Sequence, residues 1–432
     1  MRAPPFPAFL PFRVLVTTLV AVCCSAAFAQ EAAPTTLPGA SVDELLAVAR
    51  ERNPDYAAML SEADAASERA VPAGALPDPK FRTEWRDITR MGEQNATLYP
   101  NRVGSTRYLL MQDVPWFGKR DLKREIAELE ADGAKGRVRG MWSELSARIK
   151  TAYAQLYYVQ KNERLTREIL DLMQHLEKVA QARYAGGLAA QQDVVRAQVE
   201  QTTMRNELTM LESERRQLQA RLNALLARPA PAALAEPEKL RPVPAPAKLD
   251  YVSLEERIRS RNPQLFTEES RLKAAEKSRD LAYRNRYPDF TFGVSPIQYE
   301  SRVREWEVMV EINIPLQQSA RRGQEREAEA MLSAARARKE GVANQVLGEL
   351  SENLAGIEAA SRSEALATTS LLPQAELTYQ AALAGYETGK VDFATLLDAQ
   401  RQIRQAKQNQ VKAQAEAQVR FAEIERLLGE DL

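Results

Sequence analysis

Side chains that could carry acid, base or nucleophilic chemistry are scarce in this 432-residue chain. His175 is the single histidine, so no Ser-His-Asp or Cys-His arrangement can form. The two cysteines, Cys23 and Cys24, both lie in an apolar stretch near the N-terminus, which leaves the remainder without thiolate ligands or disulfides. No Gly-rich phosphate loop follows a predicted strand. The sequence therefore predicts no enzyme, no metal site and no cofactor.

Residues 1–29 have the pattern of a signal peptide. Arg2 and Arg13 precede an apolar run, and Ala27-Phe28-Ala29 is a small-residue cleavage signal. We expect a Sec-exported mature chain that begins at Gln30. Lipidation of Cys23 or Cys24 is the alternative.

The composition favours long helices over a compact catalytic domain. Basic and acidic residues number 59 each, so the formal net charge is zero and gives no reason to expect a nucleic-acid partner. Charged residues make up 27% of the chain and aromatic residues only 6%. No apolar run after the signal approaches the ~20 residues that a membrane helix needs, so any membrane crossing would be made by strands.

A turn motif occurs twice and organises the rest of the chain. Tyr184 is followed by Gly187 and by Ala-Gln at 197–198, and Tyr386 is followed by Gly389 and by Ala-Gln at 399–400. Each copy lies between two long helix-periodic segments with almost no Pro or Gly. The motif therefore predicts the turn of a helical hairpin, at 184–190 and again at 386–392. The chain is predicted to be two copies of one unit.

The repetition extends beyond the turns, because an Arg-Asn-Pro step at 52–54 returns at 261–263. We divide the mature chain into a first repeat (30–228), a Pro/Ala-rich linker (229–250) and a second repeat (251–432). The linker is expected to be an extended, unpacked crossing. The first repeat should open with a helix that runs to about Arg69, begun by a capping box of Ser41 and Glu44.

Each repeat is also predicted to hold one strand hairpin, at about 80–115 and about 289–315. In the clearest strand, Trp, Val and Ile alternate with Glu305, Glu307 and Glu311, so one face is apolar and the other acidic. Two hairpins cannot close a membrane barrel, so several chains would have to contribute strands. The glutamates would then ring a pore with carboxylates, or merely keep a lumen wall polar while Arg82 and Arg86 offset their charge. An ordinary half-buried strand of a soluble sheet is the alternative.

Long coiled-coil helices follow each hairpin. The segment from Arg120 to Tyr184 has 65 residues, or about 100 Å of helix. Apolar residues step by three and four from Trp142 to Val159 and again from Leu165 to Val179, which is the seam of a coiled coil. These helices are predicted to pack side by side.

This arrangement resembles the TolC-type outer-membrane efflux family over essentially the whole mature chain. The step Pro115-Trp-Phe-Gly-Lys-Arg120 is similar to the strand-to-helix corner of the heavy-metal branch. The resemblance implies a mainly α fold with a small β part: two tandem repeats that trimerise into a 12-stranded β-barrel and an α-helical periplasmic barrel. It also implies a passive exit duct in the outer membrane for an inner-membrane transporter and a periplasmic adaptor, with heavy-metal cations as cargo.

The resemblance further implies functional residues at the helical turns. The periplasmic gate falls on Asp193, Tyr386 and Asp398. A family arginine falls on Val391 and a family aspartate on Thr395, so Asp392 is the expected substitute in the gate. The adaptor-docking tip comprises six residues of the two turns. These are Tyr184, Gly186, Gly187, Leu188, Gly389 and Lys390.

A periplasmic coiled-coil adaptor or a structural scaffold is the competing interpretation. Adaptors usually flank one helical hairpin with Gly-rich β domains, whereas this sequence predicts two helical hairpins and two strand pairs with an apolar face. The second turn, with its extra charges, is expected to carry the gate, and the first to serve docking.

Overall fold

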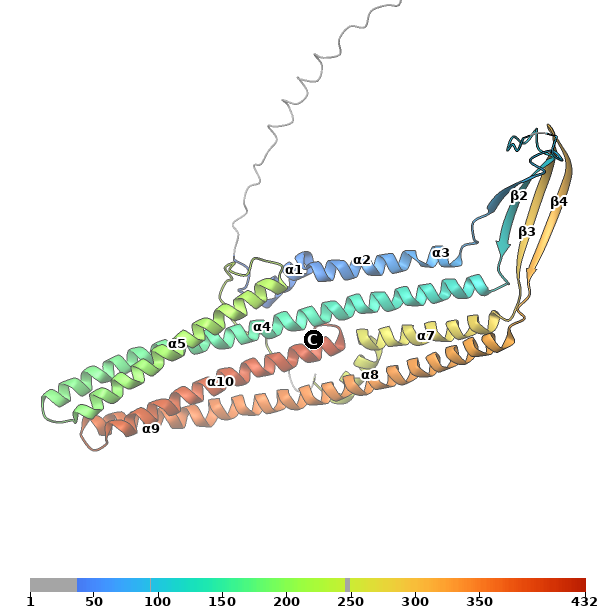
Figure 1. The fold of residues 1–432 in the computed structure, drawn as a ribbon. Coiled ribbons are helices and arrows are strands. Elements are labelled where there is room, and N and C mark those ends of the chain that lie inside the picture. The colour runs from blue at the N-terminus through green and yellow to red at the C-terminus, as the bar shows by residue number, and fades with distance from the viewer. Residues whose placement is uncertain (1–36, 94, 245–248) are drawn as a thin grey trace, which may run out of the picture. The chain divides into compact units, whose positions relative to one another are not determined.

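The computed structural model describes residues 37–93, 95–244 and 249–432, and its elements belong to the unit Pro38–Leu432 (Figure 1). The predicted signal peptide lies outside the described residues. The described chain is mainly helical with one small sheet, as expected. The elements before the linker are α1 (Val42–Arg52), α2 (Pro54–Glu68), α3 (Ala70–Gly74), β1 (Lys80–Arg86), β2 (Ser105–Val114), α4 (Lys119–Ala185) and α5 (Gln191–Leu225). Those after it are α6 (Tyr251–Arg261), α7 (Pro263–Arg284), β3 (Asp289–Tyr299), β4 (Arg302–Asn313), α8 (Gln318–Leu366), α9 (Leu372–Glu387) and α10 (Phe393–Leu428).

The opening helix differs from the prediction. A continuous helix to Arg69 is wrong, because the chain breaks at Asn53 between α1 and α2. Ser41 does cap α1 by accepting from the backbone N–H of Glu44 at 3.4 Å. The capping box is not formed, since the Glu44 carboxylate accepts from the N–H of Gly39, two residues before the cap.

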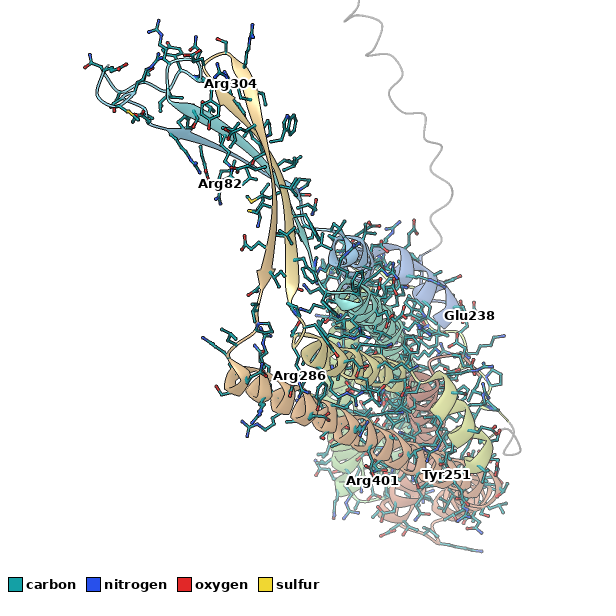
Figure 2. All side chains as sticks on the ribbon, turned by 90° about the vertical axis from the view of Figure 1, so that its right-hand side faces the viewer. Arg82, Glu238, Tyr251, Arg286, Arg304 and Arg401 are labelled. Atoms are coloured by element: carbon teal, nitrogen blue, oxygen red, sulfur yellow. The ribbon has the colours of Figure 1, made fainter. Side chains whose placement is uncertain are left out.

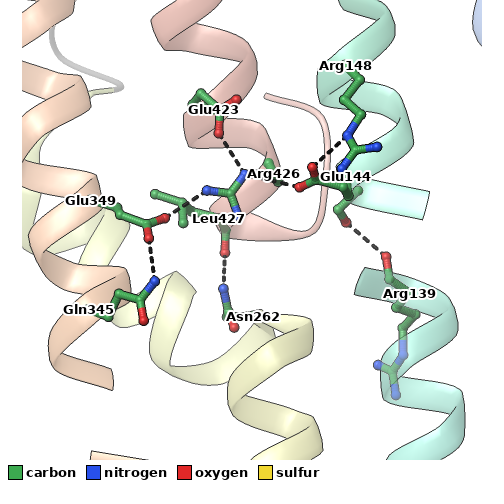
Figure 3. Close-up of polar contacts among 10 residues, drawn as sticks. Arg139, Glu144, Arg148, Asn262, Gln345, Glu349, Glu423, Arg426 and Leu427 are labelled. Carbon is green, nitrogen blue, oxygen red and sulfur yellow. Dashed lines mark hydrogen bonds and ion pairs between the residues drawn. The ribbon is translucent and has the colours of Figure 1, made fainter. Parts of the chain in front are cut away.

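The repeated Arg-Asn-Pro steps have one structural role in both halves. Asn53 caps α2 by accepting from the Tyr56 N–H at 3.0 Å, and its amide donates to the Leu225 carbonyl at the end of α5 at 2.9 Å. Asn262 caps α7 in the same way and donates to the Leu427 carbonyl near the end of α10 at 2.7 Å (Figure 3). Each buried asparagine therefore starts one helix and satisfies the end of another. The Arg-Asn-Pro step occurs twice in the sequence because both halves use its asparagine to join two helices.

The strands form one antiparallel sheet in the order β1-β2-β3-β4. The predicted hairpins pair within each repeat, and β2 pairs with β3, with Met111 opposite Gly293 and Val114 opposite Phe290. This central pairing joins the two repeats. Within the described chain, β1 and β4 are left as the edges of the sheet.

The long helices form as predicted. The α4 helix is 67 residues long without a break, and its seam is buried from Leu145 to Val159. The prediction that the seam includes Val179 is wrong, because this side chain is 42% exposed. The corresponding rod of the second repeat, α8 and α9, contains a π-helical segment at Ala367–Leu371, directly before Pro373. Proline lacks an N–H and its ring crowds the carbonyl four residues back, so the helix widens there to continue.

The linker is not the unpacked crossing that its prolines suggested. Leu234 is buried in the core formed by α1, α4 and α5, and Leu240 packs against the same core. Arg241 forms two hydrogen bonds of 3.0 Å with the Glu425 carboxylate of α10. The described part of the linker is therefore bound to the helices of both repeats.

The helices form two kinds of contact within this unit. Close to the sheet, α2, α4, α7 and α8 lie side by side in that order (Figure 1). Away from the sheet, α4 with α5 and α9 with α10 form the two predicted hairpins, and α4 also packs against α10. Among the described residues, no helix combines the length and apolarity that a membrane span requires. The two hairpin turns lie together at the end opposite the sheet (Figure 1).

Candidate functional site

The two helical turns have the same backbone geometry. In the first, the Leu188 N–H donates to the Arg183 carbonyl at 2.8 Å and the Gly187 N–H to the Tyr184 carbonyl at 3.0 Å. In the second, Lys390 and Gly389 make the equivalent bonds to Gly385 and Tyr386. This is the Schellman motif, which needs a left-handed residue at its fifth position. The φ angles there are +72° and +73°, so both turns require their glycine.

The tyrosines that begin the two turns have different environments. Tyr184 is 48% exposed, whereas Tyr386 is 3% exposed and packs against the ring of Phe393 at 5.3 Å. The Tyr386 hydroxyl is buried and has no hydrogen-bond partner among the described residues. Burial raises the pKa of this hydroxyl, and the nearby Asp193 carboxylate raises it further. The tyrosine of the second turn therefore belongs to the core of the tip.

Arg183 of α4 joins the two turns and was not predicted. Its Nη1 donates to the Glu387 carbonyl at 2.7 Å, and its guanidinium lies 4.9 Å from the centroid of the Tyr386 ring. The arginine thus binds both the backbone and the aromatic ring of the second turn. A signal was present in the sequence: the position that matches Arg183 in the second repeat is Gly385, so the motifs differ just before each tyrosine.

The three predicted gate aspartates have distinct positions. Asp193 is half-buried in the first turn of α5, and burial raises its pKa, with the Asp392 charge adding to the shift while Arg196 and Arg183 oppose it. Asp392 caps α10 through the N–H of Thr395 at 3.0 Å, and its bonds to Thr395 lower its pKa. Of the proposed gate residues, the structure therefore brings Asp193, Tyr386 and Asp392 together.

The third aspartate stands apart in the described chain. Asp398 forms an ion pair with Arg401 of the same helix at 3.3 Å, and its side chain is 67% exposed. Arg401 also binds the buried Glu200 of α5 at 2.7 Å, which links the two hairpins a few turns above the tip. Asp398 is thus an exposed carboxylate beside an arginine that Glu200 holds in place.

The predicted docking residues form the outer end of the hairpins. Leu188 is 71% exposed, and Tyr184, Gly186, Gly187, Gly389 and Lys390 are exposed beside it. An exposed leucine and a lysine with no partner among the described residues leave this end available for contact. His175, farther up α4, is exposed and bonds only to the Asp171 carbonyl of its own helix.

The sheet has one apolar and one polar face, as the alternation predicted. On the apolar face of β4, Trp306 and Val308 are 71% and 80% exposed, and they lie opposite Pro296 and Val294 of β3. The apolar side chains continue across the sheet to Phe292, Leu110 and Phe81, which are also exposed. So large an exposed apolar surface marks contact with a membrane or another protein.

Part of the charge of the acidic face is compensated by an arginine that was not predicted. Arg107 of β2 reaches Glu307 at 2.6 Å and Glu84 at 3.9 Å, and its Nε donates to the Ser295 hydroxyl at 3.1 Å. Glu305 accepts from the Tyr299 hydroxyl at 3.3 Å, and Glu311 lies opposite Thr291.

Arg82 and Arg86, which were expected to offset the charge of the acidic face, contribute less to it than Arg107 does. Arg82, which lies on the sheet in Figure 2, contacts Glu84 of its own strand at 3.7 Å, and no ion pair is seen for Arg86 among the described residues. Arg107 was missed because its carboxylate partner Glu307 lies 200 residues away in the sequence. Within the described chain, no group of three or more His, Cys, Asp or Glu side chains could hold a metal ion.

Long hairpins with interlocked turns, joined to a sheet that has an apolar exposed face and a polar face, define a channel-forming membrane protein. The family model described as "Outer membrane efflux protein" matches residues 45–228 and 254–430. The chain belongs to this outer membrane efflux protein family.

The comparisons with individual proteins agree with this assignment. The cobalt-zinc-cadmium resistance protein CzcC of Cupriavidus metallidurans is 26% identical over 426 residues, which covers 93% of this chain and 92% of the relative. The solved structure of CusC has a TM-score of 0.77 at 18% identity and covers 90% of this chain and 92% of that chain. VceC of Vibrio cholerae has a TM-score of 0.76 at 19% identity, covering 90% and 96%.

Family membership decides between the interpretations of the sequence. The protein is a transport channel of the outer membrane that extends into the periplasm, and it is not an enzyme. Channels of this family are homotrimers that work with an adaptor and an inner-membrane transporter. The alternative of a periplasmic adaptor or a scaffold finds no support in the family match.

Proposed function

We propose that this chain is the passive exit duct of an efflux pump for heavy-metal cations. The observation that carries the proposal is the similarity to CzcC, whose name states cobalt, zinc and cadmium resistance, along nearly the full length of both chains. We further propose that the mature chain is organised as the repeats 30–228 and 251–432, joined by 229–250.

The strand-to-helix corner supports the proposed heavy-metal branch. The ring of Trp116 stacks on the ring of Tyr287, with 5.1 Å between the centroids. The backbone N–H of Trp116 donates to the Asp289 carboxylate at 2.8 Å. The Lys119 ammonium binds the same carboxylate at 2.8 Å, and Gly118 turns the chain with a φ of +79°. Trp116, Gly118 and Lys119 of the Pro115–Arg120 step therefore form the corner between β2 and α4.

The substrate can be tested in a strain that lacks this gene. We expect the deletion strain to accumulate cobalt, zinc or cadmium, measured by mass spectrometry of washed cells, and the plasmid-borne gene to restore the lower level. Unchanged metal content combined with new sensitivity to organic compounds would replace metal cations by an organic cargo.

At the tips, we propose that Asp193, Tyr386, Asp392 and Asp398 form the constriction of the duct. Tyr386 is supported by its burial and by its contact with Arg183. Three copies of each carboxylate around one axis would need counter-ions or water, which makes such a constriction sensitive to charge. The exposure of Asp398 beside Arg401 supports its inclusion in the constriction.

The remaining surfaces have complementary proposed roles. The turn residues Tyr184, Gly186, Gly187, Leu188, Gly389 and Lys390 dock the adaptor. The apolar sheet face contacts outer-membrane lipid, and Glu305, Glu307 and Glu311 face the lumen, where Arg107 compensates part of their charge. The balanced net charge supports no nucleic-acid partner.

A further inference from the structure

A recess of about 670 Å³ lies in the helical layer next to the sheet. Residues of α2, α4, α7 and α8 all line it, and these four helices pack side by side in that order. Side chains from four helices in a row can border one hollow only if the layer is curved around it. The recess is therefore on the concave face of the layer, the face that turns toward the axis when such layers close into a ring.

The charged side chains around the recess are mainly arginines. Arg137, Arg271 and Arg338 come from α4, α7 and α8, Arg69 lies in the turn between α2 and α3, and Glu130 and Glu327 are the acidic residues of the lining. Arg271 pairs with Glu268 at 2.7 Å. For the side chains of the other three arginines, the described residues provide no hydrogen bond or ion pair. The lining thus has four positive and two negative charges, an excess of two positive charges per chain.

The convex face of the same layer is organised differently. There the cations pair with carboxylates of the adjacent helix: Lys277 with Glu125 at 2.6 Å, and Arg336 with Glu276 at 3.8 Å. Lys339 likewise pairs with Glu269. Ion pairs between helices thus hold these three cations of the convex face, whereas Arg69, Arg137 and Arg338 of the recess have no ion pair among the described residues.

Small residues at the bottom of the recess leave room for the arginine side chains. Gly133, Ala274, Ala275 and Ala328 are small, and the guanidinium of Arg137 lies 3.9 Å from the position that a Cβ on Gly133 would occupy. Arg137 therefore folds over the glycine and into the recess. Guanidinium groups bind carboxylate and phosphate oxygens through paired hydrogen bonds, and more strongly than they bind neutral acceptors.

We propose that this recess is an anion-binding station in the wall of the conduit, specific for small anions with phosphate or carboxylate oxygens. The inference rests on the proposed function, because the concave face borders the lumen only if the chain forms the duct. Three copies around the axis bring the recess arginines of three chains to one level. Such a belt raises the local anion concentration and makes this section prefer anions.

The test compares two matched pairs of substitutions in the purified full-length protein. Arg137→Gln/Arg338→Gln removes two positive charges from the recess. Lys135→Gln/Arg336→Gln removes the same charge from positions two residues earlier on the same helices, which face roughly the opposite way. A third pair, Arg69→Gln/Arg338→Gln, repeats the experiment if the first variant fails to assemble.

Two measurements follow. In planar bilayers under a potassium chloride gradient, the reversal potential should shift toward cation preference in the recess variants and stay unchanged in the control pair. In calorimetric titration with inorganic phosphate, the recess variants should bind more than about tenfold more weakly, since charge-assisted hydrogen bonds are lost.

Each failure has a separate meaning. Open channels whose reversal potential and phosphate binding are the same in all variants would overturn the anion station and leave the duct intact. Phosphate binding that falls equally in the control pair would also overturn it, because the effect would then be one of net charge. A correctly folded protein that never conducts would overturn the proposed duct itself.

Discussion

At the scale of single residues, Arg183 is the side chain that joins the first helical turn to the second. It binds the Glu387 carbonyl and covers the Tyr386 ring, and all three lie at the end of the molecule where the two hairpins meet. The sequence-matched Gly385 cannot substitute, because even a Cβ there would lie 2.6 Å from Val391. The two repeats therefore differ at this position: the arginine of the first donates to a carbonyl of the second turn, and the glycine of the second leaves room for Val391.

Replacing Arg183 by Gln should favour the open state of the channel. The variant loses a cation–π contact and weakens a hydrogen bond, together worth about 2 kcal/mol, or more than about tenfold in an opening equilibrium. Single-channel recordings should show a higher open probability. Lys390→Gln, which removes an exposed cation from the neighbouring turn, is the control and should leave the open probability as it is. Equal behaviour of the two variants would remove Arg183 from the gate.

Protonation of Asp193 should stabilise the tip. Burial raises its pKa above the ordinary 3.8, so the folded tip holds this proton more tightly than the unfolded chain does. Its ionisation therefore destabilises the tip at neutral pH, and the free energy of local unfolding should rise as the pH falls through the raised pKa and level off below about 3.8.

The corresponding measurement is hydrogen exchange of the tip amides in Asp193→Asn. Protection factors should exceed those of the unsubstituted protein at pH 7, and the difference should be smaller at pH 3.8, where a pKa above 3.8 leaves more than half of the Asp193 carboxylates protonated. A difference of the same size at both pH values would show that the carboxylate is not the titrating group.

At the scale of elements, the linker and the C-terminus are fixed by one buried carboxylate. Glu425 of α10 accepts from Lys150 of α4 at 2.6 Å, from Arg241 of the linker and from the Leu432 N–H, and its side chain is 3% exposed. A neighbouring network around Arg426 joins α10 to Glu349 of α8 at 2.7 Å (Figure 3). These contacts hold the two repeats together across α4 and α10.

Glu425→Gln should destabilise the protein strongly. It leaves the Lys150 ammonium in a buried position with only Asp431 as a charged partner, and breaking a buried ion pair from one side costs about 3–5 kcal/mol. The melting temperature of the extracted protein should fall by several degrees. Glu358→Gln, which breaks the exposed pair with Arg362, should cost less than about 1 kcal/mol. Equal losses would mean that Glu425 has no special role.

The elements show which features a sequence can predict. The turns, the strand alternation and the α4 seam from Leu145 to Val159 depend on residues within a few positions of each other, and they were predicted. The Asn-Pro steps were recognised as a repeat, but their capping role was missed. Arg183 with Glu387, Arg241 with Glu425 and Arg107 with Glu307 are each separated by more than 180 residues. Their pairing depends on how the repeats pack, which local pattern does not contain.

At the scale of the whole molecule, each region of the chain has a surface suited to one part of a conduit. The sheet has an exposed apolar face and a polar face, the helical layer next to it has a recess lined by arginines, and the two hairpin turns form the far end. The family assignment was predictable from the sequence because it depends on the repeat and the turn motifs. The charge of the helical wall was not, since the six charged residues of the recess come from three helices and from the turn between α2 and α3.

The most direct test of the account is the conductance of the protein purified from the outer-membrane fraction and inserted into planar lipid bilayers. We predict discrete channels in the unsubstituted protein and a larger single-channel conductance in Tyr386→Ala/Asp398→Ala, because the tips form the narrowest point of the duct. Recovery of the protein from the soluble periplasm without any conductance would contradict the duct, and an unchanged conductance in the variant would contradict the gate.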